Sequence, residues 1–382
     1  MILEFGAKNY YSFKEGFEVN LRLNKSCPEL ISKNKDYVNL LSLQGANASG
    51  KTNVLKVLSF INYFTLHSFS SMKPDELIPF HSYFNNNETT EIFLIFLSDG
   101  IEYTYEITLT SEKIISEIIY KKNKRSQQII KRINNKLEVT VGSFKELKSI
   151  KLRDNVSLIS TALQYELDSI EVIANLFRDI LAPNVSEEGL HSENWNYKEI
   201  SQLYFDDKEV FNFVKKILKK ADNGINDIKI VKKENDDTGE IEYFPVFIYK
   251  INKDKHILKY YEQSSGIKSL YTQLGFYKLS LLAGSTLILD EFDINLHPDL
   301  LPMLVNLFED EKINSNNGQL IFTSHNDAIM NKLSKYRIVL VNKKDNESYL
   351  YRLDEIPGDI LRNDRQISPI YNSGKLGGKP EL

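Results

Sequence analysis

The sequence predicts an α/β fold in which a mixed central sheet is joined to an antiparallel β lobe and a short helical arm insertion. Three patterns support this fold class. The apolar run from Val38 to Leu43, a glycine-rich turn and the stretch from Asn53 to Phe64 read as strand, turn and helix. Residues 90–142, with the turn Ser98-Asp99-Gly100, are typical of consecutive antiparallel strands. Residues 265–345 return to alternating strands and helices.

The turn in the first pattern is a complete phosphate-binding loop, the P-loop of NTPases. Its glycines let backbone N–H groups surround a β-phosphate, and the following helix N-terminus adds positive partial charge. Lys51 is expected to reach the β- and γ-phosphates, and the Thr52 hydroxyl to coordinate Mg²⁺. The sequence therefore predicts that the chain binds a nucleoside triphosphate. The predicted binding residues here are Gly45, Asn47, Ala48, Ser49, Gly50, Lys51, Thr52 and Asn53.

Two later strands end in residues that suit the same ligand. Ser285-Thr-Leu-Ile-Leu-Asp-Glu brings Asp290 to a strand tip, where its carboxylate is a hard oxygen ligand for Mg²⁺. Glu291 is then placed to orient and deprotonate an attacking water. Gly318-Gln-Leu-Ile-Phe-Thr-Ser-His ends at His325, whose imidazole can donate to a phosphate oxygen and report whether the γ-phosphate is present.

A segment of small residues precedes another predicted helix, Leu270–Leu282. Free N–H groups at such a helix N-terminus favour an anion, which makes Ser264, Ser265 and Gly266 candidate nucleotide-binding residues. As a bare string, Ser-Ser-Gly is usually only a helix cap. Its position ahead of the strand that ends in Asp290 and Glu291 favours a role in nucleotide binding.

Composition sets broad limits. Net charge is −4, and 26% of residues are charged, which neither requires nor excludes a local nucleic-acid-binding stripe. No segment is long and apolar enough for a membrane span, and the N-terminus lacks the pattern of a signal peptide. The single cysteine, Cys27, rules out an internal disulfide. We therefore expect a cytoplasmic protein with no membrane partner.

Four parts are expected along the chain. Residues 1–142 form the N-terminal part of an ATPase head with the β lobe, and 143–222 form the helical arm. Residues 223–345 form the C-terminal part of the head, and 346–382 form a tail. The pattern also predicts irregular chain from about 60 to 88.

The arm and the segment after it carry their own signals. Residues Ser201–Lys220 are expected to form one amphipathic helix with a cationic C-terminus. A polar turn is expected at residues 235–239. Strands are expected at Ile225–Lys233, Glu242–Asn252 and His256–Tyr261.

The order of these motifs resembles the ABC-type ATPase heads of the RecF/SMC/OLD-like group. The opening Phe5-Gly-Ala-Lys-Asn-Tyr-Tyr-Ser-Phe resembles the start of those heads and implies that Lys8 helps to hold the nucleotide. The run Asp290-Glu-Phe-Asp-Ile-Asn-Leu-His-Pro resembles their Walker B motif and D-loop, with Asp293 near an opposing subunit. The resemblance implies that the cofactors are ATP and Mg²⁺.

Within this group, the short arm resembles compact AAA ATPases of bacterial phage-defence and abortive-infection operons. The tail Ile370-Tyr-Asn-Ser-Gly-Lys-Leu-Gly-Gly-Lys-Pro resembles the C-terminus of the RloA/AbiL-like ATPase subunit. This resemblance implies a partner, a separately encoded nuclease or toxin of the Toprim type.

The sequence also departs from the group. Ser265 stands where transporters and SMC heads carry glycine in Ser-Gly-Gly. No glutamine lies between the phosphate loop and Gln127, so the usual Q-loop ligand is missing or replaced. His81 or Asn85 could stand in for it.

One phosphate loop and one signature segment imply an assembly. In heads of this kind, the signature of one molecule closes over the γ-phosphate held by another, so two copies complete two sites. We expect a homodimer with ATP sandwiched between its subunits. Ser264 and Gly266 would act in trans, whereas Lys51, Thr52, Asp290, Glu291 and His325 would act in cis.

Two functions remain open. The first is an ATPase that serves as engine or sensor of an anti-phage defence system and controls a separate nuclease or toxin. The alternative is a RecF-like ATPase that binds DNA in repair, for which the best feature is the basic stretch from Lys121 to Arg132. Such a stretch is usually a solvated hairpin face. A transporter motor fits the signature and Walker B context poorly.

Overall fold

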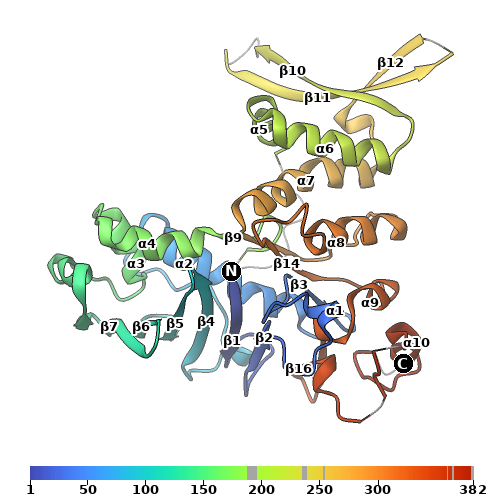
Figure 1. Ribbon diagram of the computed structural model, residues 1–382. Coiled ribbons are helices and arrows are strands. Elements are labelled where there is room, and N and C mark those ends of the chain that lie inside the picture. Colours follow the sequence, from blue (N-terminus) through green and yellow to red (C-terminus); the bar gives the residue numbers. More distant parts are fainter. Residues whose placement is uncertain (187–195, 235–238, 253, 359, 364, 380–382) are drawn as a thin grey trace.

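The computed structural model describes residues 1–186, 196–234, 239–252, 254–358, 360–363 and 365–379. Its described strands form three sheets, with helices between and around them (Figure 1). This arrangement confirms the expected mixed central sheet and antiparallel lobe. The turn expected at 235–239 falls mostly outside the described residues, as does Pro380 of the tail motif.

The central sheet has the strand order β16-β15-β3-β14-β13-β9. Neighbouring strands are parallel except for the antiparallel pair of β15 and β16. Because buried parallel strands are continuous apolar runs and their carboxyl ends share one edge, the phosphate loop and both strand-end motifs meet there. The strands are β3 (Leu40–Gln44), β9 (Ile180–Leu181), β13 (Thr286–Leu289), β14 (Gln319–Thr323), β15 (Ile338–Lys344) and β16 (Glu347–Arg352).

Each face of the central sheet belongs to a different hydrophobic core. Ile288 and Ile321 pack with α2 (Lys51–Ser71) and the β lobe, whereas their neighbours Leu287 and Leu320 pack with α7 (Ser265–Ala283). This alternation follows from the two-residue period of a strand. The second core also includes α8 (Leu301–Glu309) and α9 (Ala328–Leu333).

Helix α2 is longer than the sequence pattern indicated. It continues to Ser71, so the expectation of irregular chain from about residue 60 was wrong for its first part. All residues from Val54 to Ile61 are buried. A helix that is covered on every side has no polar face, so the usual amphipathic period is missing from its sequence.

The β lobe is one antiparallel sheet in the order β2-β1-β4-β5-β6-β7-β8. The hairpin expected at Asp99-Gly100 is present, with positive φ at both residues, as the favoured two-residue turn requires. The strands are β1 (Ile2–Lys8), β2 (Phe17–Asn20), β4 (Thr90–Ser98), β5 (Ile101–Leu109), β6 (Ile114–Lys122), β7 (Ser126–Ile133) and β8 (Lys136–Thr140).

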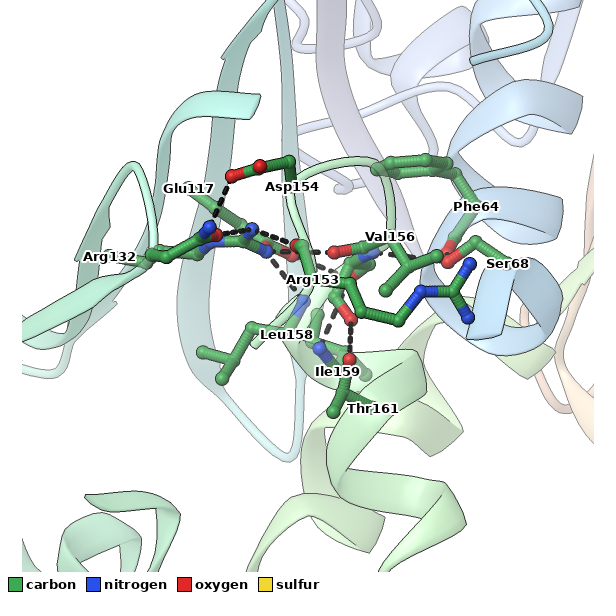
Figure 2. Close-up of polar contacts among 12 residues, drawn as sticks. Phe64, Ser68, Glu117, Arg132, Arg153, Asp154, Val156, Leu158, Ile159 and Thr161 are labelled. Atoms are coloured by element: carbon green, nitrogen blue, oxygen red, sulfur yellow. Dashed lines mark hydrogen bonds and ion pairs between the residues drawn. The ribbon is translucent and has the colours of Figure 1, made fainter. Parts of the chain in front are cut away.

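A buried ion pair joins this lobe to the end of α2 (Figure 2). Arg132 on β7 and Glu117 on β6 are both buried, with 3.3 Å between Nη1 and Oε2. Arg132 also donates to the carbonyls of Val156 and Arg153, and the Arg153 guanidinium donates to the carbonyl of Met72, which caps α2. The lobe is therefore tied to the C-terminal end of the phosphate-loop helix.

The middle of the chain supplies helices to both cores. α3 (Leu158–Gln164) and α4 (Asp168–Arg178) pack on α2, whereas α5 (Tyr197–Asp206) and α6 (Lys208–Ala221) pack beside α7 (Figure 1). The single helix expected over Ser201–Lys220 was wrong. Asp207 divides it, because its carboxylate accepts from the N–H groups of Glu209 and Val210 and so begins a new helix.

A three-stranded antiparallel sheet lies on α5 and α6, at the far end from the β lobe (Figure 1). Its strands are β10 (Ile225–Glu234), β11 (Ile241–Ile251) and β12 (Asp254–Lys259), close to the expected ranges. The tail packs on the central sheet instead, where the Tyr351 hydroxyl of β16 donates to Leu376 O and the N–H of Gly378 donates to Asn342 Oδ1 of β15. The remaining α-helices are α1 (Glu29–Ser32) and α10 (Ile367–Asn372). No helix in the described ranges has the length and apolar character needed to cross a bilayer.

Candidate functional site

The phosphate loop connects β3 to α2 and passes close to β15 and β16. Gly45 and Gly50 have φ values of +155° and +109°. A Cβ on Gly45 would lie 2.2 Å from Val341 O, and one on Gly50 would lie 2.7 Å from Ser348 Oγ. Both positions therefore require glycine, for the backbone angle and for the close approach.

Lys51 begins α2 and points back into the loop. Its Nζ donates to Gly45 O and Ala46 O, each at 2.9 Å, and the side chain is 7% exposed. Burial lowers the pKa of this ammonium, while the carboxylates of Asp290 and Glu291 oppose that change. Lys51 thus carries a buried charge that is held by neutral carbonyl groups.

Thr52 and Asp290 meet directly, although 238 residues separate them in the chain. Thr52 Oγ1 donates to Asp290 Oδ2 at 2.6 Å. The other carboxylate oxygen accepts from the Thr323 hydroxyl and from the N–H of Glu291. Asp290 is 2% exposed and has no ion pair with another described residue. A hydroxyl in contact with a buried carboxylate that has no ion pair fits a small divalent cation.

Asn184 holds the backbone of this carboxylate, a role that sequence reasoning missed. It follows β9, the parallel neighbour of β13, and is 6% exposed. Its Nδ2 donates to Asp290 O at 2.7 Å, and its Oδ1 accepts from Asp290 N at 3.1 Å. The two residues that could replace the Q-loop glutamine, His81 and Asn85, contact each other at a separate cavity beside Tyr11.

Glu291 and His325 line the same cavity as the phosphate loop. Glu291 has φ of +48°, and its N–H donates to Thr323 Oγ1 at 2.7 Å. His325 is exposed at the end of β14, and its backbone N–H donates to Asp293 Oδ2 at 3.1 Å. The Asp293 carboxylate therefore links the loop after β13 to the loop after β14 within one chain.

These groups surround one cavity of about 470 Å³. This volume is in the range of small-molecule sites. The Ser49 hydroxyl is buried in the loop and has no hydrogen-bond partner among the described residues. The donor set, the buried ammonium and the hydroxyl–carboxylate pair fit the phosphates of a nucleotide with Mg²⁺. The lining residues are Ser12, Asn47, Ala48, Ser49, Gly50, Lys51, Thr52, Asn53, Asp290, Glu291, His325 and Lys343.

Ser12 and Lys343 are the lining residues that sequence reasoning did not select. Ser12 Oγ accepts from Asn53 Nδ2 at 2.9 Å and from Ser348 Oγ at 2.8 Å. Its signal was available, because Ser12 is part of the opening motif that drew attention to Lys8. Lys343 has no comparable signal, since it lies near the end of β15 and reaches the site only through the parallel pairing with β3.

The other residues that were predicted to bind the nucleotide do not line this cavity. Lys8 is exposed at the end of β1 and is not among the residues that line it. Ser264 and Ser265 are exposed at the start of α7, where Ser264 Oγ accepts from Ile267 N at 3.3 Å. A Cβ on Gly266 would lie 2.7 Å from Asn295 O, so the α7 N-terminus packs closely on the loop after β13.

Comparisons with known proteins identify a family and a fold. The family described as "AAA domain, putative AbiEii toxin, Type IV TA system" matches residues 40–331. A crystal structure of an SMC head bound to the C-winged helix domain of ScpA has a TM-score of 0.51 at 13% identity, covering 92% of this chain and 96% of that chain. The SMC head domain from Thermotoga maritima has a TM-score of 0.45 at 13% identity, covering 92% and 98%. A search of curated proteins gave no match. The likeness to the first structure confirms the expected fold of an ABC-type ATPase head.

Proposed function

The chain belongs to the AAA family described for the AbiEii toxin of type IV toxin–antitoxin systems, and from this premise we propose that it hydrolyses ATP with Mg²⁺. One observation carries the proposal. A buried ammonium, Lys51, and a buried carboxylate, Asp290, line the same cavity and are not bonded to each other. Two buried charges of opposite sign that form no ion pair with each other suit a phosphate and a metal ion, which would neutralise both at once.

The residues divide the chemistry among them. Lys51 binds phosphate oxygens, while Thr52 and Asp290 hold the cation, which supplies Lewis-acid stabilisation of negative charge. Glu291 orients a water and accepts its proton, and His325 donates to a phosphate oxygen. Catalysis by such a site is mainly positioning and charge stabilisation.

We further propose that two copies complete the site. Ser264, Ser265 and Gly266 are exposed or half-buried, and the cavity of their own chain does not include them. Their exposure leaves the α7 N-terminus available to a phosphate held by a second copy. Asp293 and Asn295, on the loop that contacts Gly266, would then lie near the twofold axis.

The Glu291→Gln variant tests this cycle. It should bind ATP with little turnover and accumulate as a dimer, since closure precedes hydrolysis. Light scattering with and without ATP measures the mass, and Asp299→Asn, an exposed carboxylate in the same region, is the matched control. A Glu291→Gln variant that stays monomeric with ATP, or that hydrolyses it normally, would refute the cycle.

Mixing two inactive variants tests the contribution in trans. Lys51→Ala removes the phosphate ligand, and Ser264→Arg blocks the α7 N-terminus. A mixed dimer has one site with neither lesion, so equimolar mixing should restore ATPase activity to about one quarter of the wild-type rate if subunits exchange randomly. Absence of any recovery would place both residues in the same site.

We also propose that the ATPase is the engine or sensor of a cytoplasmic anti-phage defence system and controls a separate nuclease or toxin. The family description and the head fold support a regulatory ATPase of this kind. Co-expression with the neighbouring reading frame tests the proposal. The two products should co-purify, and the mixture should be toxic to the host only when both are present. DNA cleavage by this chain alone would contradict it.

DNA binding in repair is the second candidate, favoured by the β6–β7 hairpin. Lys122, Lys124 and Arg125 are exposed there, although Lys122 contacts Glu102 at 2.9 Å. Binding through such a hairpin should weaken steeply as salt is raised. A titration of duplex DNA at two salt concentrations, with the Lys124→Glu variant as comparison, distinguishes this function from partner control.

A further inference from the structure

The sheet of β10, β11 and β12 has one face on helices and one face that no described element covers (Figure 1). Ile228 and Phe247, which are opposite each other in the register, are buried in the core with Tyr271 of α7. Side chains alternate along a strand, so the intervening residues in the middle of the sheet face away from the helices, whereas Asp227 and Glu242 near the strand ends reach lysines of α6 and α5. This outer face is the feature from which the inference starts.

The register places apolar residues in the middle of the outer face. Phe244 is opposite Val231, and Ile248 is opposite Ile257. Val246 lies between these two pairs on the central strand. Val231 and Ile257 are 42% and 61% exposed, unusually high for β-branched residues in a sheet. These five residues form the apolar centre.

Lysines border this centre. Lys229 and Lys259 lie on either side of Val246, and Lys250 is directly opposite Lys255. All four are exposed, and none has an ion pair with a described residue. The carboxylates of the same rows are already engaged, Asp227 by Lys215 and Glu242 by Lys198. The outer face therefore carries an excess of positive charge.

The pair of Lys250 and Lys255 is informative because it destabilises the sheet. Like charges directly opposite each other destabilise an antiparallel pair. Stability alone would favour a carboxylate at one of the two positions. An acidic ligand on the outer face gives both lysines a partner and removes the repulsion.

We propose that the outer face of β10–β12 binds an acidic amphipathic segment of a partner protein. The apolar centre would receive the segment's hydrophobic residues, and Lys229, Lys250, Lys255 and Lys259 would pair with its carboxylates. The assignment extends the proposed function, because the protein that the ATPase controls is the expected owner of the segment. Its evidence is the sheet itself and does not depend on nucleotide hydrolysis.

The chemistry of the centre favours protein over nucleic acid. Four of its five residues are aliphatic, and Phe244 is the single aromatic ring among them. Surfaces that bind single strands use several aromatic rings on which bases stack. An aliphatic patch with a charged rim instead matches the anatomy of a protein interface.

A labelled 18-residue helical peptide with leucines on one face and glutamates on the other is the probe. Fluorescence anisotropy measures its affinity for the full chain, and a lysine-for-glutamate version of the peptide should not bind. The Lys229→Glu/Lys250→Glu variant should weaken binding by about tenfold or more. Lys145→Glu/Lys148→Glu, an equal charge change at exposed lysines beyond β8, should retain wild-type affinity.

Folding is monitored in both double variants and in the single variant Lys250→Glu. The Lys250→Glu substitution places a carboxylate opposite Lys255, so it should keep or raise the melting temperature while it lowers peptide binding. Equal losses in both double variants would overturn the proposal, because general charge would then explain binding. It would also be overturned if a 30-nucleotide single strand or anionic vesicles bound the outer face while the acidic peptide did not. ATPase activity, measured separately, reports on the proposed function and should be unchanged.

Discussion

Buried charges lie near both ends of α2, but among the described residues they form an ion pair only near its C-terminal end. At its C-terminal end, Glu117 and Arg132 neutralise each other inside the fold. Glu117 also accepts from the Tyr105 hydroxyl and from Leu158 N, so both of its oxygens are engaged by the protein. Burial and the nearby Glu117 carboxylate raise the pKa of Tyr105, which keeps this hydroxyl protonated as a donor.

At the N-terminal end, two buried charges, Lys51 and Asp290, form no ion pair with any described residue. Lys51 Nζ is bonded to carbonyls, and Asp290 is bonded to hydroxyls and an N–H, but no ion pair joins them. The contrast teaches that burial of charge alone does not identify a site. A carboxylate whose counter-ion is built into the fold has a structural role, whereas one that lacks a counter-ion is available to a ligand.

Neutralising each carboxylate should separate the two ends most clearly. Glu117→Gln leaves Arg132 buried without a counter-ion and should lower the free energy of unfolding by about 3–5 kcal/mol. Asp290→Asn breaks no ion pair but weakens hydrogen bonds from Thr52 and Thr323, so it should lower the free energy of unfolding by less, about 1–3 kcal/mol. Urea unfolding measures both. Similar losses of unfolding free energy in the two variants would contradict the distinction between the two carboxylates.

The same contrast explains what the sequence revealed. The phosphate loop, Asp290 and His325 were predictable because each stands at the end of an apolar run with a recognisable local pattern. Parallel pairing then brings such strand ends to one edge of the sheet. The fold class was predictable for the same reason, since burial on both faces leaves a continuous apolar strand.

Other features had no local pattern to reveal them. Asn184 is one amide after a two-residue strand, and its role appears only when β9 pairs with β13. The extent of α2 was hidden because a helix buried on every side lacks an amphipathic period. The division at Asp207 depends on one capping side chain rather than on periodicity.

Loss of Asn184 should have the next largest effect. Asn184→Ala removes both hydrogen bonds that hold the Asp290 backbone, so it should lower kcat by about tenfold to a hundredfold through misplacement of the carboxylate. It should also raise the Mg²⁺ concentration for half-maximal activity. Exposed Asn223→Ala is the control. A lower melting temperature with an unchanged Mg²⁺ requirement would show that Asn184 acts only on stability.

The smallest expected effect is the pH dependence of stability that the buried Lys51 ammonium causes. Burial lowers the pKa of Lys51 in the folded protein, so the unfolded chain keeps this proton to higher pH. Because the unfolded state then binds more protons, the free energy of unfolding rises with pH from that lowered pKa up to about 10.4. The stability of wild type relative to Lys51→Met should therefore increase as pH rises toward 10.

Denaturant unfolding from neutral pH to pH 10 measures this difference, and Lys145→Met controls for the loss of an exposed lysine. A difference that stays constant with pH, or that falls, would mean that Lys51 carries no burial penalty in the folded state. The N-terminal end of α2 would then be as well compensated as its C-terminal end.

Calorimetric titration with ATP, in Mg²⁺ and in EDTA, tests the central claim most directly. If Asp290 and Thr52 hold a cation beside the phosphates bound by Lys51, Mg²⁺ should strengthen ATP binding to wild type by about tenfold or more. Asp290→Asn should lose that gain while it keeps its fold and its Mg²⁺-independent binding. The same gain in Asp290→Asn as in wild type would contradict the account.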